Sequence, residues 1–191
     1  KIEISKKSYI KWCGINDTRH ISVILNNKVT LHNFYVPAGG DVPDTESNVK
    51  FAHKIAFLKE MVTYFKGDKT KKKILVGDLN IAPYENDVWS HRQLLKVVSH
   101  TPIETENLKK LLNDGNWVDI MRKFIPLEEK VFSWWSYRNR DWKKSNRGRR
   151  LDHVWLSEDL LSSAKKMIVY KEARDWEKPS DHVPVVLEID L

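Results

Sequence analysis

A stretch with helical spacing between two β-prone runs most constrains the fold of this chain. Its apolar side chains step by four, three, four and three residues, at Phe51, Ile55, Leu58, Val62 and Phe65. This spacing predicts an amphipathic helix that buries one face, with Gly67 as its stop. A β-prone run at 28–36 precedes the helix, and a short buried strand at 74–76 follows it. Strands interspersed with helices predict an α/β or α+β domain in which helices pack on a sheet.

Turn and cap signals add further elements on both sides of this unit. They predict a hairpin of strands 21–25 and 28–36, a helix at 102–113 and strands at 150–156 and 183–189. Asn26-Asn27 links the two hairpin strands, because asparagine tolerates the positive φ of a tight turn. Thr101 and Glu104 have the spacing of a capping box, with Pro102 at the first helical position.

Length and composition fit one globular domain. The 191 residues are 41% hydrophobic and 31% charged, without a repeat or a flexible linker, so we expect a single domain over 1–191. No apolar run approaches the ~18 residues that span a bilayer, and residues 1–10 lack the apolar core of a signal peptide. The single cysteine, Cys13, excludes an internal disulfide and a Cys-rich zinc site and fits a reducing compartment. The excess of Lys and Arg over Asp and Glu gives a net charge of +7, which favours a polyanionic binding partner.

The first candidate for chemistry is the segment Gly77-Asp78-Leu79-Asn80, which directly follows the predicted strand 74–76. On an extended backbone, Asp78 and Asn80 project to the same side. A carboxylate there can accept a proton or bind a hard metal, and the amide can donate to a phosphoryl oxygen. Gly77 would let a ligand approach closely. A polar turn after a strand is the alternative interpretation, because Gly, Asp and Asn are common in turns.

Two further candidates pair an aspartate with a histidine. Ser180-Asp181-His182 stands directly before the predicted strand 183–189, and a neighbouring carboxylate can hold an imidazole in one tautomer. Asp152 lies inside an apolar strand, where a carboxylate needs a partner. The alternatives are a histidine that only caps the strand, and a salt bridge from Asp152 to Arg149 or Arg150.

The fourth candidate, residues 132–150, combines aromatic and basic side chains. The aromatics from position 134 onward are Trp134, Trp135, Tyr137 and Trp142, and the cations are Arg138, Arg140, Lys143, Lys144, Arg147, Arg149 and Arg150. Cations contact phosphates and flat rings stack on bases, so this segment predicts a nucleic-acid contact. Core packing of each Trp and a solvated loop are the alternatives. The run Lys69–Lys73 has no aromatics and predicts an ordinary charged loop.

Together and in this order, several segments resemble the exodeoxyribonuclease III family of abasic-site endonucleases, bacterial type, within the deoxyribonuclease I-like endonuclease/exonuclease/phosphatase superfamily. They are NFYVPAGG (33–40), VGDLNIAP (76–83), FSWWSYR (132–138), NRGRRLDHVWLS (146–157) and KPSDHVPVV (178–186). The resemblance implies a two-sheet α/β sandwich flanked by helices, with the site built by loops at one end. It covers almost the whole chain.

Residue by residue, the resemblance implies a set of catalytic roles. The implied catalytic residues are Tyr35, Asp78, Asn80, Asp152 and His182, and the implied ligands of a magnesium ion are Asp78, Asn80, Asp181 and His182. Asp78 would position or deprotonate the attacking water, and Asp152 would orient His182. Tyr35, Asn80 and His182 would contact the phosphate.

The same resemblance implies the DNA contacts. They are Trp134, Trp135, Tyr137, Arg138, Arg149 and Arg150, with Trp134 against a flipped-out abasic sugar and Trp135 lining the same pocket. Two features depart from the family pattern: Ala38 stands where some relatives have an amide, and Asp41 lies where some have a cation. An N-terminal strand with an asparagine and a metal-binding glutamate is not found either, so we expect the chain to hold about the C-terminal three quarters of the domain.

The implied activity is Mg²⁺-dependent hydrolysis of phosphodiesters 5′ to abasic sites in double-stranded DNA, with 3′-5′ exonuclease and 3′-phosphatase activity. Mn²⁺ would substitute for Mg²⁺. The expected partner is DNA with abasic sites or 3′ ends, bound by a monomer in the bacterial cytoplasm. A DNA-binding fragment without catalysis, and a phosphodiesterase of the same fold that acts on another phosphate ester, are the alternatives. The basic aromatic segment favours DNA over a small head group.

Overall fold

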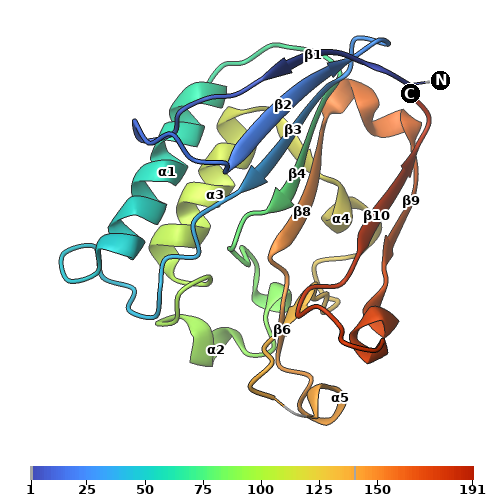
Figure 1. Cartoon of the computed structure of the whole chain (residues 1–191). Helices are drawn as coiled ribbons and strands as arrows, with labels where there is room; N and C mark the ends of the chain where they lie inside the picture. The colour runs from blue at the N-terminus through green and yellow to red at the C-terminus, as the bar shows by residue number, and fades with distance from the viewer. Residues whose placement is uncertain (1, 140) are drawn as a thin grey trace.

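A six-stranded sheet forms the centre of the computed structural model, which describes residues 2–139 and 141–191 (Figure 1). In spatial order its strands are β1 (Ile4–Ser8), β2 (His20–Leu25), β3 (Thr30–Tyr35), β4 (Lys73–Asp78), β8 (Asp152–Ser157) and β5 (Trp117–Asp119). Only β3 and β4 pair in parallel, since helix α1 (Val49–Phe65) carries the chain back between them. The other neighbouring pairs are antiparallel.

Two helices, α1 and α3 (Pro102–Asp114), cover one face of this sheet (Figure 1). The predicted apolar face of α1 is buried, and it packs with Phe34, Leu75 and Trp155 of the sheet in one large core. The predicted start of α3 is confirmed, because the Glu104 carboxylate accepts hydrogen bonds from the N–H and the hydroxyl of Thr101. No helix among the described residues has the length and apolar character to cross a membrane.

The opposite face of the sheet is covered by a two-stranded sheet, β9 (Ala164–Val169) and β10 (Val185–Ile189). Ile74, Val154 and Leu156 of the large sheet form an apolar cluster with side chains of β9 and β10. The layers are therefore helices, a large sheet and a small sheet, which confirms the predicted sandwich.

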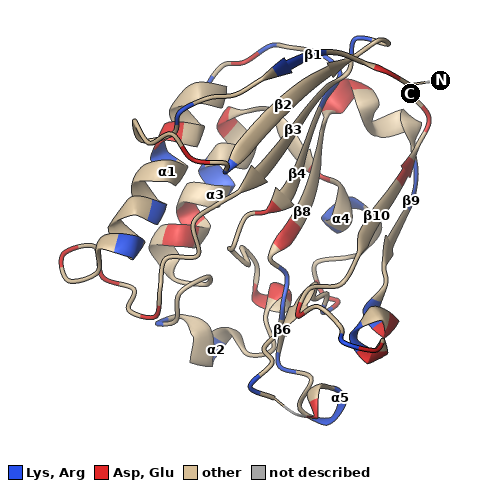
Figure 2. Cartoon of the chain, viewed as in Figure 1, with Lys and Arg blue, Asp and Glu red and all other residues tan. Residues whose placement is uncertain are grey.

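Short elements connect these layers, and several of them gather at the end of the molecule where β4 stops and β8 starts, whereas η2 directly follows β8 at the opposite end (Figure 1). They are η1 (Glu85–Asp87), α2 (His91–Leu94), α4 (Ile120–Phe124), β6 (Trp134–Trp135), α5 (Trp142–Ser145), β7 (Gly148–Arg149), η2 (Glu158–Ser163) and η3 (Lys171–Asp175). Acidic residues mark the facing ends of β4 and β8, and basic residues surround α5 (Figure 2).

Two local predictions need correction. The hairpin of β2 and β3 is confirmed, but the positive φ of its turn falls on Lys28 rather than on the asparagines. The run Lys69–Lys73 is not wholly a loop, because Lys73 begins β4 and is only 1% exposed. Its ammonium group pairs with Asp68 and lies over the ring of Trp117, so the apolar surroundings tolerate the charge.

Candidate active site

Three predicted site residues form a row across the centre of the large sheet. In the strand register, Tyr35 at the end of β3 pairs with Asp78 at the end of β4, and Asp78 pairs with Asp152 at the start of β8. Side chains of directly paired residues lie on the same face of a sheet, about 5 Å apart. Three segments distant in sequence therefore bring a phenol and two carboxylates together. Tyr35 is the exposed end of this row, with the Arg19 guanidinium 5.2 Å from its ring centroid.

His182 joins the row from the segment before β10. Its Nδ1 lies 2.8 Å from Asp152 Oδ2, and its Nε2 lies 3.9 Å from Asp78 Oδ2. Burial opposes the charged imidazole, but the hydrogen bond to Asp152 and the charges of Asp152, Asp78 and Asp181 outweigh it and raise the pKa of His182. The alternative of a histidine that only caps a strand is therefore wrong, and neither Arg149 nor Arg150 forms the salt bridge considered for Asp152.

Asp78 carries excess negative charge. Burial and the nearby charge of Asp152 raise the pKa of Asp78 to about 6, although His182, the N–H of Asn80 and Lys54 act in the opposite direction. A carboxylate with such a pKa is still largely ionised at neutral pH and is a stronger base than an exposed aspartate. The site therefore favours a proton, a cation or an oriented water near this group.

Asn80 holds Asp78 in place. Its backbone N–H donates to Asp78 Oδ1 over 2.9 Å, and its side-chain amide donates to Asp78 Oδ2 and to the carbonyl of Val36. Both amide hydrogens are thus in use. Asn80 has a left-handed backbone with φ of 53°, which asparagine tolerates better than most residues.

Gly77 has a different role from the predicted one. Its φ is 132°, and a Cβ at this position would collide with the carbonyl oxygen of Phe34 on the adjacent strand. The glycine is therefore required for close packing of β4 on β3, and not for the approach of a ligand.

Lys54 of α1, which no sequence signal singles out, contacts the loop that carries Asn80. Its ammonium group donates to the carbonyls of Ala38 and Asn80 and pairs with Glu104, and both side chains of the ion pair are 0% exposed. The two hydrogen bonds join the loop after β3 to the loop after β4, and the ion pair links α1 to α3. A lysine within an amphipathic helix gives no sequence signal that distinguishes it from surface lysines.

Part of the basic aromatic segment borders the site. Trp134 forms an isolated bridge with His182, and its indole N–H donates to Asp181 over 2.9 Å. The guanidinium of Arg149 lies 5.3 Å from the Trp134 ring centroid. Tyr137 and Arg138 are exposed, as a contact with nucleic acid requires. Arg140 lies outside the described residues.

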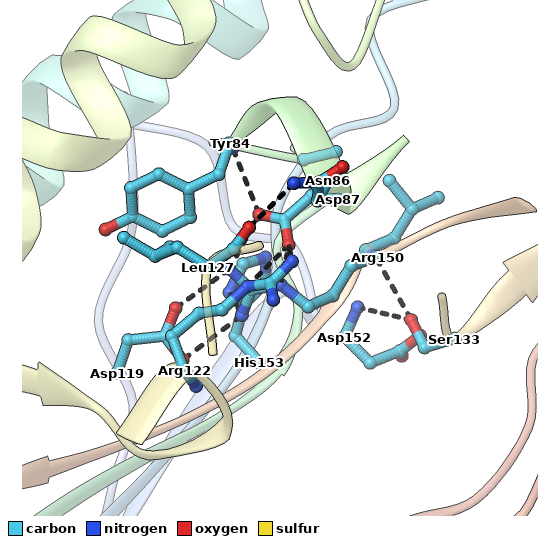
Figure 3. A network of polar contacts seen from close by, with 12 residues as sticks. Tyr84, Asn86, Asp87, Asp119, Arg122, Leu127, Ser133, Arg150, Asp152 and His153 are labelled. Carbon is cyan, nitrogen blue, oxygen red and sulfur yellow. Dashed lines mark hydrogen bonds and ion pairs between the residues drawn. The ribbon is translucent and has the colours of Figure 1, made fainter. Parts of the chain in front are cut away.

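Two predicted DNA contacts are wrong. Trp135 is only 1% exposed, because it packs with Phe132 and Trp142 in an apolar cluster. Arg150 is 0% exposed and pairs with the carboxylates of Asp87 and Asp119 (Figure 3). Neither side chain can reach a ligand, since both are covered by the fold itself.

The predicted magnesium ligands are not assembled into a ready set. In the described part of the chain, no three His, Cys, Asp or Glu side chains are arranged to hold a metal ion. Asp181 is turned toward the Trp134 indole, whereas Asp78 is a half-buried carboxylate with a raised pKa, whose negative charge a divalent cation would neutralise. Mg²⁺ commonly uses only one or two protein carboxylates and completes its shell with water and phosphate, so Asp78 fits such an ion.

Comparisons with known proteins find relatives over most of the chain. Residues 16–182 match the profile of the endonuclease/exonuclease/phosphatase family. Exodeoxyribonuclease III of Haemophilus influenzae is 30% identical over 168 residues, which cover 84% of this chain and 61% of that protein. An exodeoxyribonuclease of Bacillus subtilis is 32% identical over 124 residues, or 65% of this chain and 47% of that protein. The chain thus spans about half to three fifths of the length of these curated relatives.

Solved structures show the same fold. An AP endonuclease from Archaeoglobus fulgidus superposes with a TM-score of 0.88 at 25% identity, over 99% of this chain and 72% of that one. A 3′ phosphatase from Neisseria, bound to a product DNA hairpin, gives a TM-score of 0.86 at 23% identity, over 99% of this chain and 72% of that one. The superposition of almost the whole chain shows the architecture of the sandwich.

Proposed function

The chain belongs to the endonuclease/exonuclease/phosphatase family, and we propose that it is a DNA repair nuclease of the exodeoxyribonuclease III type. It would hydrolyse phosphodiesters 5′ to abasic sites in double-stranded DNA and act at 3′ ends as an exonuclease and a phosphatase. The names of the relatives and the match of the sandwich fold support this proposal. We further propose that it acts as a monomer in the bacterial cytoplasm.

The contact of His182 with both Asp152 and Asp78 carries the proposal. A phosphodiester resists attack because its negative oxygens repel nucleophiles, so a site must supply an oriented water and positive charge. Asp78, with its pKa raised to about 6, would orient and deprotonate the water. His182, with its pKa raised and its Nδ1 bound to Asp152, would donate from Nε2 to a phosphate oxygen.

Asn80 and Tyr35 assist this chemistry in different ways. Because both amide hydrogens of Asn80 are already used by Asp78 and Val36, we assign Asn80 to positioning Asp78 rather than to binding the phosphate. The exposed hydroxyl of Tyr35, at the end of the row, would contact the phosphate. Among the described residues, no Ser or Cys side chain is hydrogen-bonded to the His182 imidazole, so we assign the Asp152–His182 pair an electrostatic role.

A divalent cation, Mg²⁺ with Mn²⁺ as a substitute, would supply positive charge to the phosphate when bound. Asp78 is the residue that fits it best, and the carbonyl oxygen of the Asn80 side chain is the nearest further predicted ligand. His182, also a predicted ligand, is assigned to the phosphate instead, because its Nδ1 is held by Asp152 and its Nε2 donates, and Asp181 is turned toward the Trp134 indole. Exposed Tyr137 and Arg138 and half-buried Trp134 would contact the DNA strand beside the site.

Cleavage by the Asp78→Asn variant tests the proposal. We expect the wild-type chain with Mg²⁺ to cut an abasic duplex and to remove a 3′-phosphate, and chelation to stop both reactions. Asp78→Asn should lower turnover about 100- to 10 000-fold, because it removes the base, while DNA binding persists. Asp190→Asn, the same change at an exposed site just after the end of β10, is the control.

These measurements distinguish a nuclease that uses Asp78 from a nuclease that does not, and from a DNA-binding fragment without catalysis. Turnover in Asp78→Asn that equals wild type would exclude Asp78 from the mechanism. DNA binding without any cleavage by the wild-type chain would instead identify a non-catalytic DNA-binding fragment.

A further inference from the structure

Ser133 lies at the junction of the segments that carry the site. It directly precedes β6 and is 0% exposed. Its N–H donates to the carbonyl of Arg149, and its own carbonyl accepts from the N–H of Val183, the residue after His182. We propose that Ser133 is a positioning residue that fixes Asp152 and, through it, His182. The role in catalysis rests on the function proposed above.

The hydroxyl of Ser133 has only one direction in which it can donate. Its oxygen accepts hydrogen bonds from the backbone N–H groups of Leu151 and Asp152, both over 3.0 Å. A serine hydroxyl has two lone pairs and one hydrogen, so these two bonds use its acceptor capacity. Its hydrogen is then free to donate to Asp152 Oδ2, which lies 2.6 Å away (Figure 3).

Asp152 Oδ2 therefore accepts hydrogen bonds from two different side chains. One comes from the Ser133 hydroxyl and the other from His182 Nδ1, over 2.8 Å. Two fixed donors on one oxygen define the plane and rotation of the carboxylate. Because the Ser133 hydroxyl also binds the Asp152 N–H, the side chain is tied to its own backbone, and Oδ2 stays aimed at the imidazole.

This orientation determines what His182 offers to the substrate. With its Nδ1–H held by Asp152, the ring presents Nε2 toward Asp78. In the described part of the chain, no Lys or Arg forms a salt bridge with Asp152, so no cation could take over this role. Partners at one remove from the reacting group commonly affect activity about 10- to 100-fold when they are lost.

Ser133→Ala, measured alone and together with Asp152→Asn, tests the proposal. We expect Ser133→Ala to lower kcat on an abasic duplex about 10-fold or more with little change in KM, and Ser133→Thr, which keeps the hydroxyl, to recover most of the loss. In the Asp152→Asn background, Ser133→Ala should add less than about 2-fold, because the residue it acts through is already altered. Equal losses in both backgrounds would overturn the proposal.

The matched control is Ser157→Ala at the other end of β8. Ser157 is also a buried serine whose hydroxyl binds backbone groups, here the N–H and carbonyl of Lys73. Its loss should lower stability without lowering kcat. If Ser133→Ala does not fold, Ser133→Cys, which keeps a weaker donor, should lose activity to a degree between serine and alanine; full activity in a folded Ser133→Cys would count against the proposal.

A second readout does not depend on turnover. In NMR spectra of the chelator-treated protein, the Nδ1 proton of His182 should be protected from exchange in the wild type and in Ser133→Thr, and broadened or lost in Ser133→Ala. Absence of cleavage by the wild type, with this pattern intact, would refute the proposed function and leave the positioning role standing. A protected proton unchanged in Ser133→Ala would refute the positioning role itself.

Discussion

Two aspartates, half-buried Asp78 and fully buried Asp87, show how differently this fold treats the same side chain. Burial by itself raises the pKa of both carboxyl groups. At Asp87 the charges and hydrogen bonds of Arg150 and Arg122 outweigh burial, and the pKa of Asp87 is lowered. At Asp78 the neighbouring charge of Asp152 adds to burial, and the pKa of Asp78 is raised to about 6.

The contacts explain the difference. Asp87 accepts from Arg150 through Nε and Nη2, from Arg122 and from the N–H of Tyr84, so both of its oxygens are satisfied within the chain (Figure 3). Within the described part of the chain, Asp78 has only Asn80 as a close donor, with His182 Nε2 at 3.9 Å. A charge balanced within the chain stabilises the fold, whereas a charge left in excess is available to a water, a cation or a substrate.

The largest expected effect comes from removing a cation from the buried ion-pair cluster of Asp87, Asp119, Arg122 and Arg150. Arg150→Met should lower the free energy of unfolding by about 3–5 kcal/mol, because it leaves Asp87 and Asp119 buried with less positive charge. Urea denaturation at neutral pH measures this loss. A change below about 1 kcal/mol would show that the cluster is not what distinguishes Asp87 from Asp78.

Combining Arg150→Met with Asp87→Asn provides the control for that result. Removal of one buried charge together with its partner should cost less than the sum of the two single changes. Simple additivity would mean that the two side chains do not depend on each other.

Asp78→Asn should act in the opposite direction on stability. In chelator at neutral pH, we expect the free energy of unfolding of the variant to be about 1–3 kcal/mol higher than that of the wild type, because ionised Asp78 is unfavourable in the folded state. The folded pKa of about 6 exceeds the ordinary value of 3.8, so the contribution of Asp78 is fully present at low pH and is lost as pH rises through 6. The advantage of the variant should therefore vanish below a pH of about 4.

Denaturation of the two proteins across this pH range measures the effect. A variant less stable than the wild type at neutral pH would mean that the ionised carboxylate is compensated in the folded state after all. Gains in stability on removal of an active-site charge are common where function requires an unfavourable arrangement.

The same two aspartates show what could be predicted from the sequence. Asp78 was identified because it follows a strand in a recognisable segment, and the strand register confirms its place beside Asp152. Asp87 belongs to no such segment, and its partner Arg150 is 63 residues away. Of the clustered arginines, periodicity could not show which one points into the core, and Arg150 was therefore wrongly predicted to contact DNA.

Helix α1 and strand β4 were predictable for a simpler reason. Their apolar spacing is local, and the core needs only that spacing to form. The prediction that Trp135 contacts DNA is wrong, because a single Trp in a basic segment gives no sign of whether it faces the core or the solvent. In this fold Trp135 packs against Phe132 and Trp142. Ser133 and Lys54 were missed because their importance depends on carbonyl and carboxylate groups that are remote in sequence.

The smallest expected change in stability is at Arg138, which is exposed, in contrast to buried Arg150. Arg138 is exposed, unlike Arg150, so Arg138→Ala should leave the free energy of unfolding within about 0.5 kcal/mol of wild type. If it contacts a phosphate, binding to duplex DNA should weaken several-fold, and the slope of log affinity against log salt should fall by about 1. Arg138→Lys keeps the charge and should keep the slope. An unchanged slope in Arg138→Ala would show that Arg138 does not neutralise a phosphate, because each neutralised phosphate must appear in the salt dependence.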